Sequence, residues 1–404
     1  MQPRKADRFR GINNRLPADR LRQMGDRDPG DFVADAVNVD LTDAGTFQSR
    51  PGYERVGLDT GCRGLTSHGG YGYYAAGNQM RRRSPDGTTI SIGALASPFA
   101  PVSHAETPRG LIISDTFVLR LVKDDAMVPL APSEPNPQPV VSIASGGLAA
   151  GKYSLMFATV DADGVRSRFT YPVEYTVGDS AALLVVAAAG VEVFATPMNA
   201  STFYSQGVST GSPMALATID TAAEPVVHRV LAPLPAGHVL GYHKGRLLSA
   251  NGSMIAASLP YNLGLHHPMQ DYFSLGAPVA LMASLDEGLW VATTEMTWFL
   301  PGDDPLNSKP QQQAPFGAVP GTLTRIPNSA EWMWFSPRGQ VRTQGGQLTL
   351  MQDDRIAFPH AETGAGIVRE QNGLRTFVTA LTGASPNGGA VMGSFMDAEV
   401  IKKE

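Results

Sequence analysis

The sequence has almost no cysteine. Cys62 is the single cysteine in 404 residues, so the chain can form no internal disulfide and no cysteine-rich zinc site. No stretch approaches the roughly 18 consecutive apolar residues of a membrane-spanning helix. The N-terminal residues are polar and basic and lack the apolar core of a signal peptide. We therefore expect a protein that is made and folded in a cytoplasm and has no membrane contact.

Long amphipathic helical patterns are also missing, whereas turn-forming residues are abundant. The chain contains 43 glycines and 31 prolines, scattered between short apolar runs without a collagen-like period. Its hydrophobic content of 43% is sufficient for a packed core. Many short strands joined by tight turns have this composition, so the sequence predicts an all-β fold.

The charge is unevenly distributed along the chain. Residues 1–30 carry eight Arg or Lys against four Asp, a net charge of +4. The whole chain carries −5, so the remaining residues carry −9. This negative net charge argues against a protein that binds nucleic acid by neutralising its phosphates. A basic arm on an acidic body suits docking to an acidic partner surface, and the alternative is a solvated terminus without a partner.

Short units of alternating apolar and polar residues recur along the chain. Residues 36–57 read as a hairpin, and hairpin turns are expected at Pro85-Asp86-Gly87 and Asn251-Gly252. Five complete meander units are expected, at residues 63–95, 102–130, 237–260, 277–303 and 322–352. Four-stranded units of this size indicate a β-propeller. We predict about six blades, with five or seven as alternatives, and a ring closed by strands from the N and C termini.

Residues 138–225 have a different pattern of apolar and polar residues from the meander units. Prolines at 132, 135, 137 and 139 form a stiff linker before them, and Pro233-Leu234-Pro235 returns the chain. Their apolar runs predict an inserted immunoglobulin-like or fibronectin-like β-sandwich. The run 181–189 fits a strand better than a helix, although its alanines leave a helix open as the alternative. The predicted organisation is therefore a basic N-terminal arm (1–35), a first propeller segment (36–131), the inserted sandwich (138–225) and a second propeller segment (233–404).

Several short segments, in order along the chain, carry a resemblance to a known family: Phe9–Pro17, Ala36–Leu41, Arg50–Gly52, His243–Leu248, Met254–Pro260, Asp286–Thr293 and Leu300–Gly302. They resemble the tail nozzle, or DNA-stabilisation, proteins of short-tailed bacteriophages. The resemblance implies a β-propeller subunit of the virion tail. Several copies, six in the expected ring, would surround the DNA exit path below the portal and adaptor. The inserted sandwich departs from the family pattern.

No motif in the sequence points to catalysis, a metal or a cofactor. The eight histidines lack metal-binding spacing, and His266-His267 on a strand would face opposite sides. A nucleophile elbow and a P-loop are both missing. Sequence-adjacent acids at 124–125, 303–304 and 353–354 are expected to be solvated. We therefore predict a protein that is not an enzyme and uses no cofactor.

Two basic groups are candidate assembly contacts. The first lies in the arm and consists of Arg4, Lys5, Arg8, Arg10 and Arg15. The second is a run in the body, Arg81, Arg82 and Arg83, that we expect on an exposed hairpin against a neighbouring subunit, with a plain solvated strand as the alternative. Genomic DNA is expected to pass through the lumen without sequence-specific binding, because strong phosphate contacts would hold it.

Two other functions remain open from the sequence. A host-recognition tail adhesin would use the inserted sandwich or the tryptophans 290, 298, 332 and 334, for which blade-core packing is the simpler interpretation. A polysaccharide hydrolase would need two converging carboxylates, which a sequence cannot show.

Overall fold

The fold is built from β-strands. The computed structural model describes residues 9–15, 21–23, 30–33, 39–41, 46–49, 57, 59–226, 228, 230–351, 361–371 and 374–383. No helix occurs among these residues, and accordingly none that could cross a membrane. The all-β prediction is confirmed.

Five four-stranded antiparallel meanders form most of the described chain. The first two sheets contain β6 (Arg63–His68), β7 (Tyr71–Ala76), β8 (Gln79–Arg83) and β9 (Thr89–Ala94), then β10 (Ser103–Thr107), β11 (Gly110–Ser114), β12 (Leu119–Lys123) and β13 (Ala126–Pro129). The third and fourth contain β22 (Val239–His243), β23 (Arg246–Asn251), β24 (Met254–Ala257) and β26 (Tyr272–Ser274), then β27 (Val279–Ser284), β28 (Gly288–Thr293), β29 (Thr297–Pro301) and β30 (Gln311–Ala314). The fifth contains β31 (Thr324–Arg325), β32 (Trp332–Ser336), β33 (Gly339–Gln344) and β34 (Gln347–Leu350).

Local turn chemistry explains these hairpins. Gly87 and Gly252 lie at positive φ angles, 92° and 60°, in the turns that join β8 to β9 and β23 to β24. Both turns fall where the sequence predicted them. The third and fourth sheets extend beyond their predicted ends, residues 260 and 303, because their fourth strands follow long loops that the periodicity did not bridge.

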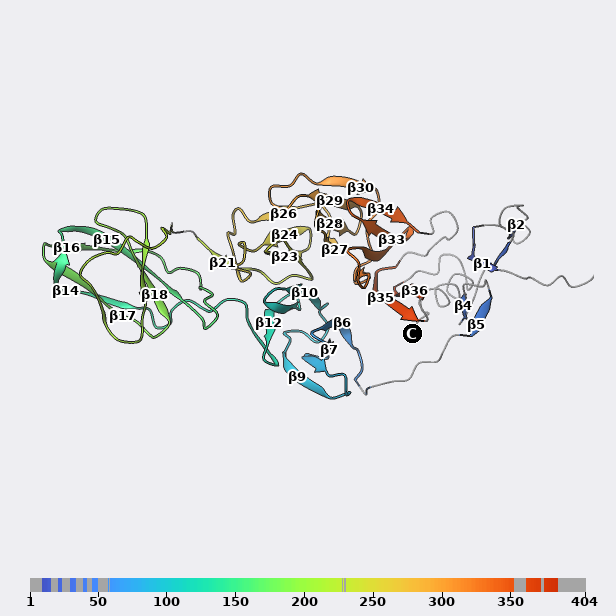
Figure 1. The fold of residues 1–404 in the computed structure, drawn as a ribbon, viewed down its shortest axis with the longest axis horizontal. Helices are drawn as coiled ribbons and strands as arrows, with labels where there is room; N and C mark the ends of the chain where they lie inside the picture. The colour runs from blue at the N-terminus through green and yellow to red at the C-terminus, as the bar shows by residue number, and fades with distance from the viewer. Residues whose placement is uncertain are drawn as a thin grey trace, which may run out of the picture.

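Successive sheets lie side by side, and the first strands of the first four sheets run in the same direction. The Arg63 guanidinium at the start of β6 donates to the carbonyl oxygens of Ser97 and Ala100, just before β10. At the start of β22, the Leu240 amide donates to Ser103 Oγ at the start of β10. Figure 1 shows the five sheets following one another around a common centre, from β6–β9 to β33–β34. The four-stranded meander is also the unit from which β-propellers are built.

Aromatic side chains form the core between the fourth and fifth sheets. Trp290 and Trp334 are fully buried, with ring centroids 6.3 Å apart. Trp290 Nε1 donates to the Gly345 carbonyl at 3.0 Å, and Trp332 Nε1 donates to the Ser284 carbonyl at 3.0 Å. The tryptophans therefore pack between sheets, as the simpler interpretation predicted. Trp332 is partly buried in this same core, and Trp298 is partly buried in the core between the third and fourth sheets.

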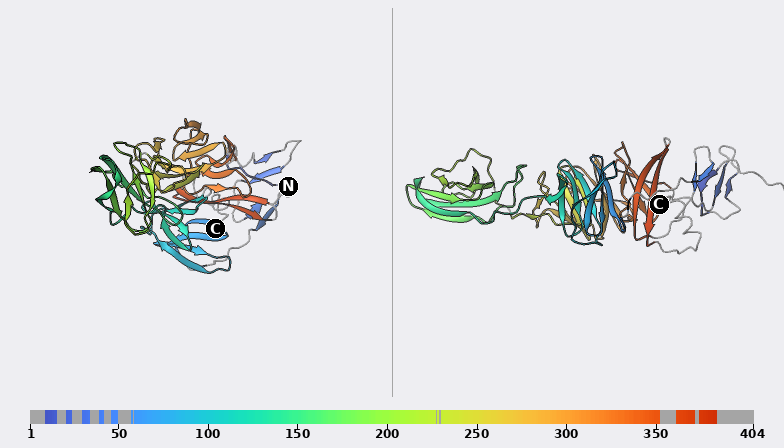
Figure 2. Two further views of the ribbon diagram at one scale, coloured as in Figure 1. Left: turned by 60° about the vertical axis from the view of Figure 1, so that its left-hand side comes forward. Right: turned by 90° about the horizontal axis from the view of Figure 1, so that it is seen from below.

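Residues 140–216 form two sheets that share one hydrophobic core. One sheet has the order β14 (Val140–Leu148), β17 (Ala181–Val186), β20 (Met214–Leu216). The other has the order β16 (Val173–Val177), β15 (Gly151–Thr159), β18 (Val191–Ala195), β19 (Tyr204–Val208). We call this region the inserted module; it projects from the side of the sheet series (Figure 2, right). Its strand order differs from the ABED and CFG sheets of an immunoglobulin domain, because its first strand pairs with its fourth.

Smaller pairs of strands complete the described chain. Near the N terminus, β1 (Phe9–Ile12), β3 (Gly30–Val33) and β2 (Arg22–Gln23) form one sheet, and β4 (Val39–Leu41) pairs with β5 (Phe47–Ser49). The short β21 (Ala232–Pro233) pairs with β25 (Leu265–His266), and β35 (Thr363–Gln371) pairs with β36 (Leu374–Thr382). The last hairpin packs beside the fifth sheet, where the Gly364 amide donates to the Pro320 carbonyl. Among the described pairings, no N-terminal strand joins this hairpin, so ring closure stays a prediction.

Candidate functional site

The predicted contacts in the basic arm are only partly placed. Arg4, Lys5 and Arg8 lie outside the described residues. Arg10 lies on β1, which pairs in parallel with β3. The backbone amide of Arg15 donates to Asn13 Oδ1 at 3.2 Å. The arm's role in assembly therefore stays a prediction.

The arginine run at 81–83 lies on β8 and is engaged within its own chain. Arg81 forms an ion pair with Asp59 at 3.0 Å, and the Tyr74 hydroxyl donates to the same carboxylate at 2.7 Å. Arg83 Nη1 lies 3.4 Å from Thr89 Oγ1 on the neighbouring strand. The three side chains are half-buried rather than exposed, because acidic and aromatic groups of the same chain surround them. The expected exposed hairpin is corrected in this respect.

Arg82 points to the opposite face of β8 from its two neighbours and joins two sheets. Its guanidinium forms an ion pair with Asp125, in the turn between β12 and β13. It also lies 4.3 Å above the centroid of the Tyr71 ring, an arrangement typical of a cation–π contact. Its side chain is 16% exposed. Arg82 therefore fastens the first sheet to the second, a role that does not require a neighbouring subunit.

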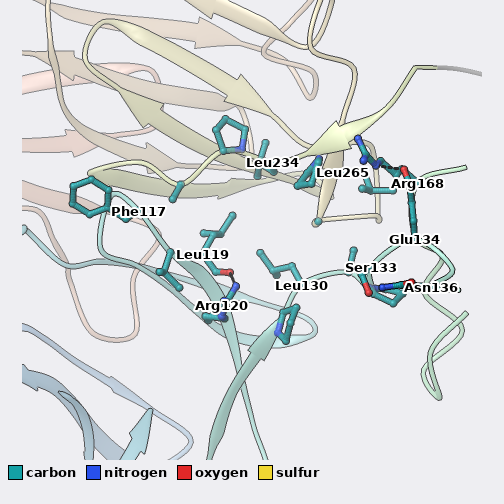
Figure 3. Close-up of a pocket in the computed structure, with 18 of the residues that line it drawn as sticks. Phe117, Leu119, Arg120, Leu130, Ser133, Glu134, Asn136, Arg168, Leu234 and Leu265 are labelled. Carbon is teal, nitrogen blue, oxygen red and sulfur yellow. Dashed lines mark hydrogen bonds and ion pairs between the residues drawn. The ribbon is translucent and has the colours of Figure 1, made fainter. Parts of the chain in front are cut away.

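A cleft lies where the inserted module joins the sheets. Its volume is about 800 Å³, and its walls come from the second sheet, from the outgoing linker 129–138 and from the returning segment 233–236. Figure 3 shows Phe117, Leu119, Leu130, Leu234 and Leu265 around its apolar side. Both proline-rich segments that marked the predicted domain boundaries thus line one cavity, which the sequence alone did not indicate.

Ion pairs join the module to the sheets around this cleft. Arg168, in the loop between β15 and β16, pairs with Glu134 of the linker at the mouth of the cleft (Figure 3). Lys123, at the end of β12, pairs with Asp163 of the same loop at 2.6 Å. The hydrogen bond between them raises the pKa of Lys123 and lowers that of Asp163. The loop at residues 160–172 therefore contacts the second sheet and the linker together.

One cation in the cleft lacks an acidic partner within the part of the chain that is described. Arg120 Nη1 donates to the Leu119 carbonyl at 3.2 Å, and no carboxylate lies within ion-pairing distance. An arginine beside an apolar wall suits an apolar group that carries a carboxylate. Sequence reasoning missed this arrangement, since part of the wall, at Leu234 and Leu265, comes from segments more than a hundred residues from Arg120.

Two histidines fasten the third sheet to the fourth. His238 Nε2 bonds the Val279 carbonyl at 2.8 Å, at the start of β27. His243, fully buried at the end of β22, places Nδ1 2.8 Å from Ser284 Oγ and Nε2 3.0 Å from the Gly302 carbonyl. Because a carbonyl only accepts, Nε2 carries the proton and Nδ1 accepts from Ser284. Burial lowers the pKa of His243, which favours this neutral form.

A metal site has no support from the geometry of the described residues. No group of three His, Cys, Asp or Glu side chains lies close enough to hold a metal ion within the described ranges. His266 Nδ1 bonds the Ala232 carbonyl at 3.2 Å. Asp304 of the acidic pair at 303–304 forms an ion pair with Arg246 at 3.3 Å.

Comparisons with known proteins give no family for the chain. No protein-family model and no curated protein sequence matches it. Among solved structures, a catalytically inactive virginiamycin B lyase from Staphylococcus aureus with quinupristin covers 80% of this chain and 92% of its own, at 12% identity and a TM-score of 0.31. Apo AztD from Citrobacter koseri covers 71% and 70%, at 8% identity and a TM-score of 0.29. KlHsv2 with one loop replaced by a Gly-Ser linker covers 78% and 95%, at 9% identity and a TM-score of 0.26. At such scores, these similarities carry no argument about function.

Proposed function

We propose that this chain is a structural subunit of a bacteriophage tail. In this proposal it forms a nozzle below the portal and adaptor that retains the packaged genome and lets it pass at infection. The observation that carries the proposal is the series of five four-stranded meanders, in which the first strands of the first four run side by side in one direction. This is the arrangement of blades around the axis of a propeller.

The finer architecture belongs to the same proposal. The hairpin of β35 and β36, completed by strands of the N-terminal region, would supply a sixth blade and close the propeller within one chain. The inserted module is then a β-sandwich that decorates the propeller from outside, with a strand order of its own. The family-like segments support this order: residues 243–248 span the turn between β22 and β23, and residues 286–293 span the turn before β28 and the whole of that strand.

The proposed partners are other copies of the chain, neighbouring tail proteins and the genomic DNA. Copies of the chain assemble into a ring, expected to be hexameric, that docks on the portal and adaptor and on other tail proteins. A ring of identical copies forms through head-to-tail contacts whose rotation closes on itself. The acidic body, with −9 outside the first 30 residues, leaves DNA free to slide through the lumen. No chemical step is assigned to the protein, and no cofactor takes part.

Removal of the chain from the virion tests this proposal. Virions assembled without it should lose packaged DNA or fail to deliver it, while capsids still form. A second variant lacking residues 1–30 should fold and yet assemble poorly onto the tail, because the basic arm is the proposed docking element. Virions that lack the chain and still retain DNA and infect normally would refute the nozzle function.

A host-recognition adhesin is the alternative function. Two observations favour it: the module projects from the side of the sheet series, and the cleft at its base contains Arg120, which has no acidic partner among the described residues. Purified protein that binds isolated host envelope, and loses binding in an Arg120→Gln variant, would support the adhesin. Protein indifferent to envelope material would leave the nozzle as the better account.

A further inference from the structure

The charges that line the cleft at the base of the module do not cancel. Three ionisable side chains belong to its lining: Arg120, Glu134 and Arg168. The Glu134 carboxylate pairs with Arg168, which leaves the charge of Arg120 uncompensated within the described lining. The cleft is therefore locally positive on a chain whose net charge is −5. A concave site lined by one sign of charge concentrates ligands of the opposite sign.

The guanidinium of Arg120 has one open edge. Its Nη1 donates to the Leu119 carbonyl at 3.2 Å, while Nε and Nη2 have no hydrogen-bond partner in the part of the chain that is described. Both atoms reach solvent, because neither belongs to the buried side-chain atoms that lack a partner. This edge of an arginine donates two parallel hydrogen bonds to a carboxylate. Arg166 binds Glu192 in this way in the same chain, at 2.6 and 2.9 Å.

The apolar wall beside Arg120 is preformed. Leu119, Leu130 and Leu234 are at most 8% exposed and belong to the hydrophobic core between the second and third sheets. Five prolines also line the cleft, at positions 129, 132, 135, 233 and 235. Their fixed φ angles restrict the backbone of the linker and of the returning segment. Figure 3 shows Arg120 and the leucines around the same space, so an apolar group can enter with little rearrangement.

The size and chemistry of the cleft select a class of ligand. Its volume of about 800 Å³ lies in the range of small-molecule sites, roughly 300–1,000 Å³. A simple inorganic anion could use the cation but would gain nothing from the apolar wall. A nucleic-acid backbone is held through several phosphate contacts, whereas the described lining offers one uncompensated cation. The lining thus suits a molecule that carries one carboxylate on an apolar body.

We propose that this cleft is a binding site for small apolar carboxylates. The carboxylate accepts hydrogen bonds from Nε and Nη2 of Arg120, and the apolar body lies against Leu130 and Leu234. The ligand contacts the second sheet, the linker and the returning segment together, so its binding stabilises the junction between the module and the sheet series. The site lies within one copy of the chain and does not depend on the nozzle function.

Isothermal titration calorimetry of the full chain tests the ligand class, with 2-naphthoate, 4-phenylbutyrate and octanoate as probes. At least one probe should saturate a single site, and its primary amide should bind at least tenfold more weakly, because the amide lacks the charge that strengthens both hydrogen bonds. Acetate and inorganic phosphate, which carry charge without an apolar body, should show no saturable binding at the same concentrations. Equal binding of acid and amide would overturn the proposal, and so would the failure of all three probes to saturate a site.

Substitutions at Arg120 locate the bound carboxylate. Arg120→Gln should weaken binding of the probe at least tenfold, and Arg120→Lys should cause a smaller loss, because lysine keeps the charge without the paired donors. Arg325→Gln is the matched control: Arg325 lies on β31 outside the cleft, and its Nε also donates to a carbonyl, that of Ser329, at 3.3 Å. Circular dichroism checks that the variants are folded. Equal affinity of the Arg120→Gln and Arg325→Gln variants would contradict the assigned role of Arg120.

A blocking substitution checks that the apolar body occupies the cleft. Ser133 is exposed and belongs to the lining, so Ser133→Trp fills part of the cleft while the buried wall keeps its residues. This variant should lose saturable binding, whereas Ser201→Trp, at an exposed position of the module outside the lining, should bind as the wild type does. Unchanged affinity in Ser133→Trp would place the ligand elsewhere. If the probes fail and a C-terminal peptide of another tail protein binds through Arg120, the cleft belongs to a protein segment and the small-molecule proposal is wrong.

Discussion

The series of four-stranded sheets and the inserted module use the same kind of strand, yet they are stabilised differently. Each sheet of the series contacts its neighbours through separate clusters of buried side chains and through polar links such as Arg82–Asp125 and His243–Ser284. The module has one main core enclosed by two sheets. The comparison implies that a destabilising substitution in one sheet of the series also weakens the neighbouring sheets, whereas a destabilising substitution in the module affects the module alone.

The largest expected effect is at Trp334, which is fully buried between the fourth and fifth sheets. A Trp334→Ala change should destabilise the sheet series by about 3–5 kcal/mol, the usual effect of removing a large buried aromatic side chain. Calorimetry should show a lower melting transition for the series and an unchanged one for the module. The half-buried Trp298, changed to Phe, is the milder control. Equal shifts of all transitions would mean that the two regions unfold as one unit.

The reciprocal change lies in the module at Leu183, which is fully buried. Leu183→Ala should lower the free energy of unfolding of the module by about 2–5 kcal/mol and leave the series unaffected. Met198→Ala, at a side chain 47% exposed, should have an effect below about 1 kcal/mol. If the series melts together with the module in the Leu183 variant, the proposed independence is wrong.

Acid should lower the stability of the contact between the third and fourth sheets, because His243 lies in that contact. Because burial lowers the pKa of His243 in the folded state, the unfolded chain binds the proton more readily. Its stabilising contribution is thus complete above the ordinary histidine pKa of about 6.5 and is lost as the pH falls below that value. The slope is at most about 1.4 kcal/mol per pH unit.

Urea unfolding between pH 7.5 and 5 measures this dependence. A His243→Gln variant keeps a donor and an acceptor in place of the two ring nitrogens, so it should show a weaker loss of stability on acidification. The positive Lys244 and the negative Asp303 and Asp304 also face His243 and remain in both proteins. Identical pH profiles for the two proteins would exclude His243 as the sensitive group.

The smallest expected effect is at the junction. Glu134→Gln removes the ion pair with Arg168 and should cost less than about 1 kcal/mol, because both side chains are partly exposed. The difference from wild type should vanish in roughly 1 M salt, where charges are screened within a few ångström. A loss that persists in high salt would show that Glu134 acts through packing rather than charge.

The sequence predicted what short-range physics determines. The turns at Pro85-Asp86-Gly87 and Asn251-Gly252, and the apolar strand that became β17, need only local composition and period. The sequence could not predict the links between sheets, since Arg82 and Asp125 are 43 residues apart and either could pair with many other charged residues. The strand order of the module also required knowing which of several similar strands pair.

The candidate site divides in the same way. Proline-rich segments marked where the module leaves and rejoins the series, but only their closeness in space makes a cleft. Three arginines in a row suggested an exposed contact, whereas Asp59, Asp125 and Tyr71 compensate them from other segments. Charge runs are therefore weak guides to interfaces unless their partners are known.

Electron microscopy of the purified chain, alone and mixed with portal–adaptor complexes, tests the central claim most directly. The nozzle account predicts rings or short tubes, expected to be six-fold, with an axial hole wide enough for duplex DNA and modules projecting outside. Single discs that each carry a side knob, even in the presence of the portal–adaptor complex, would contradict it.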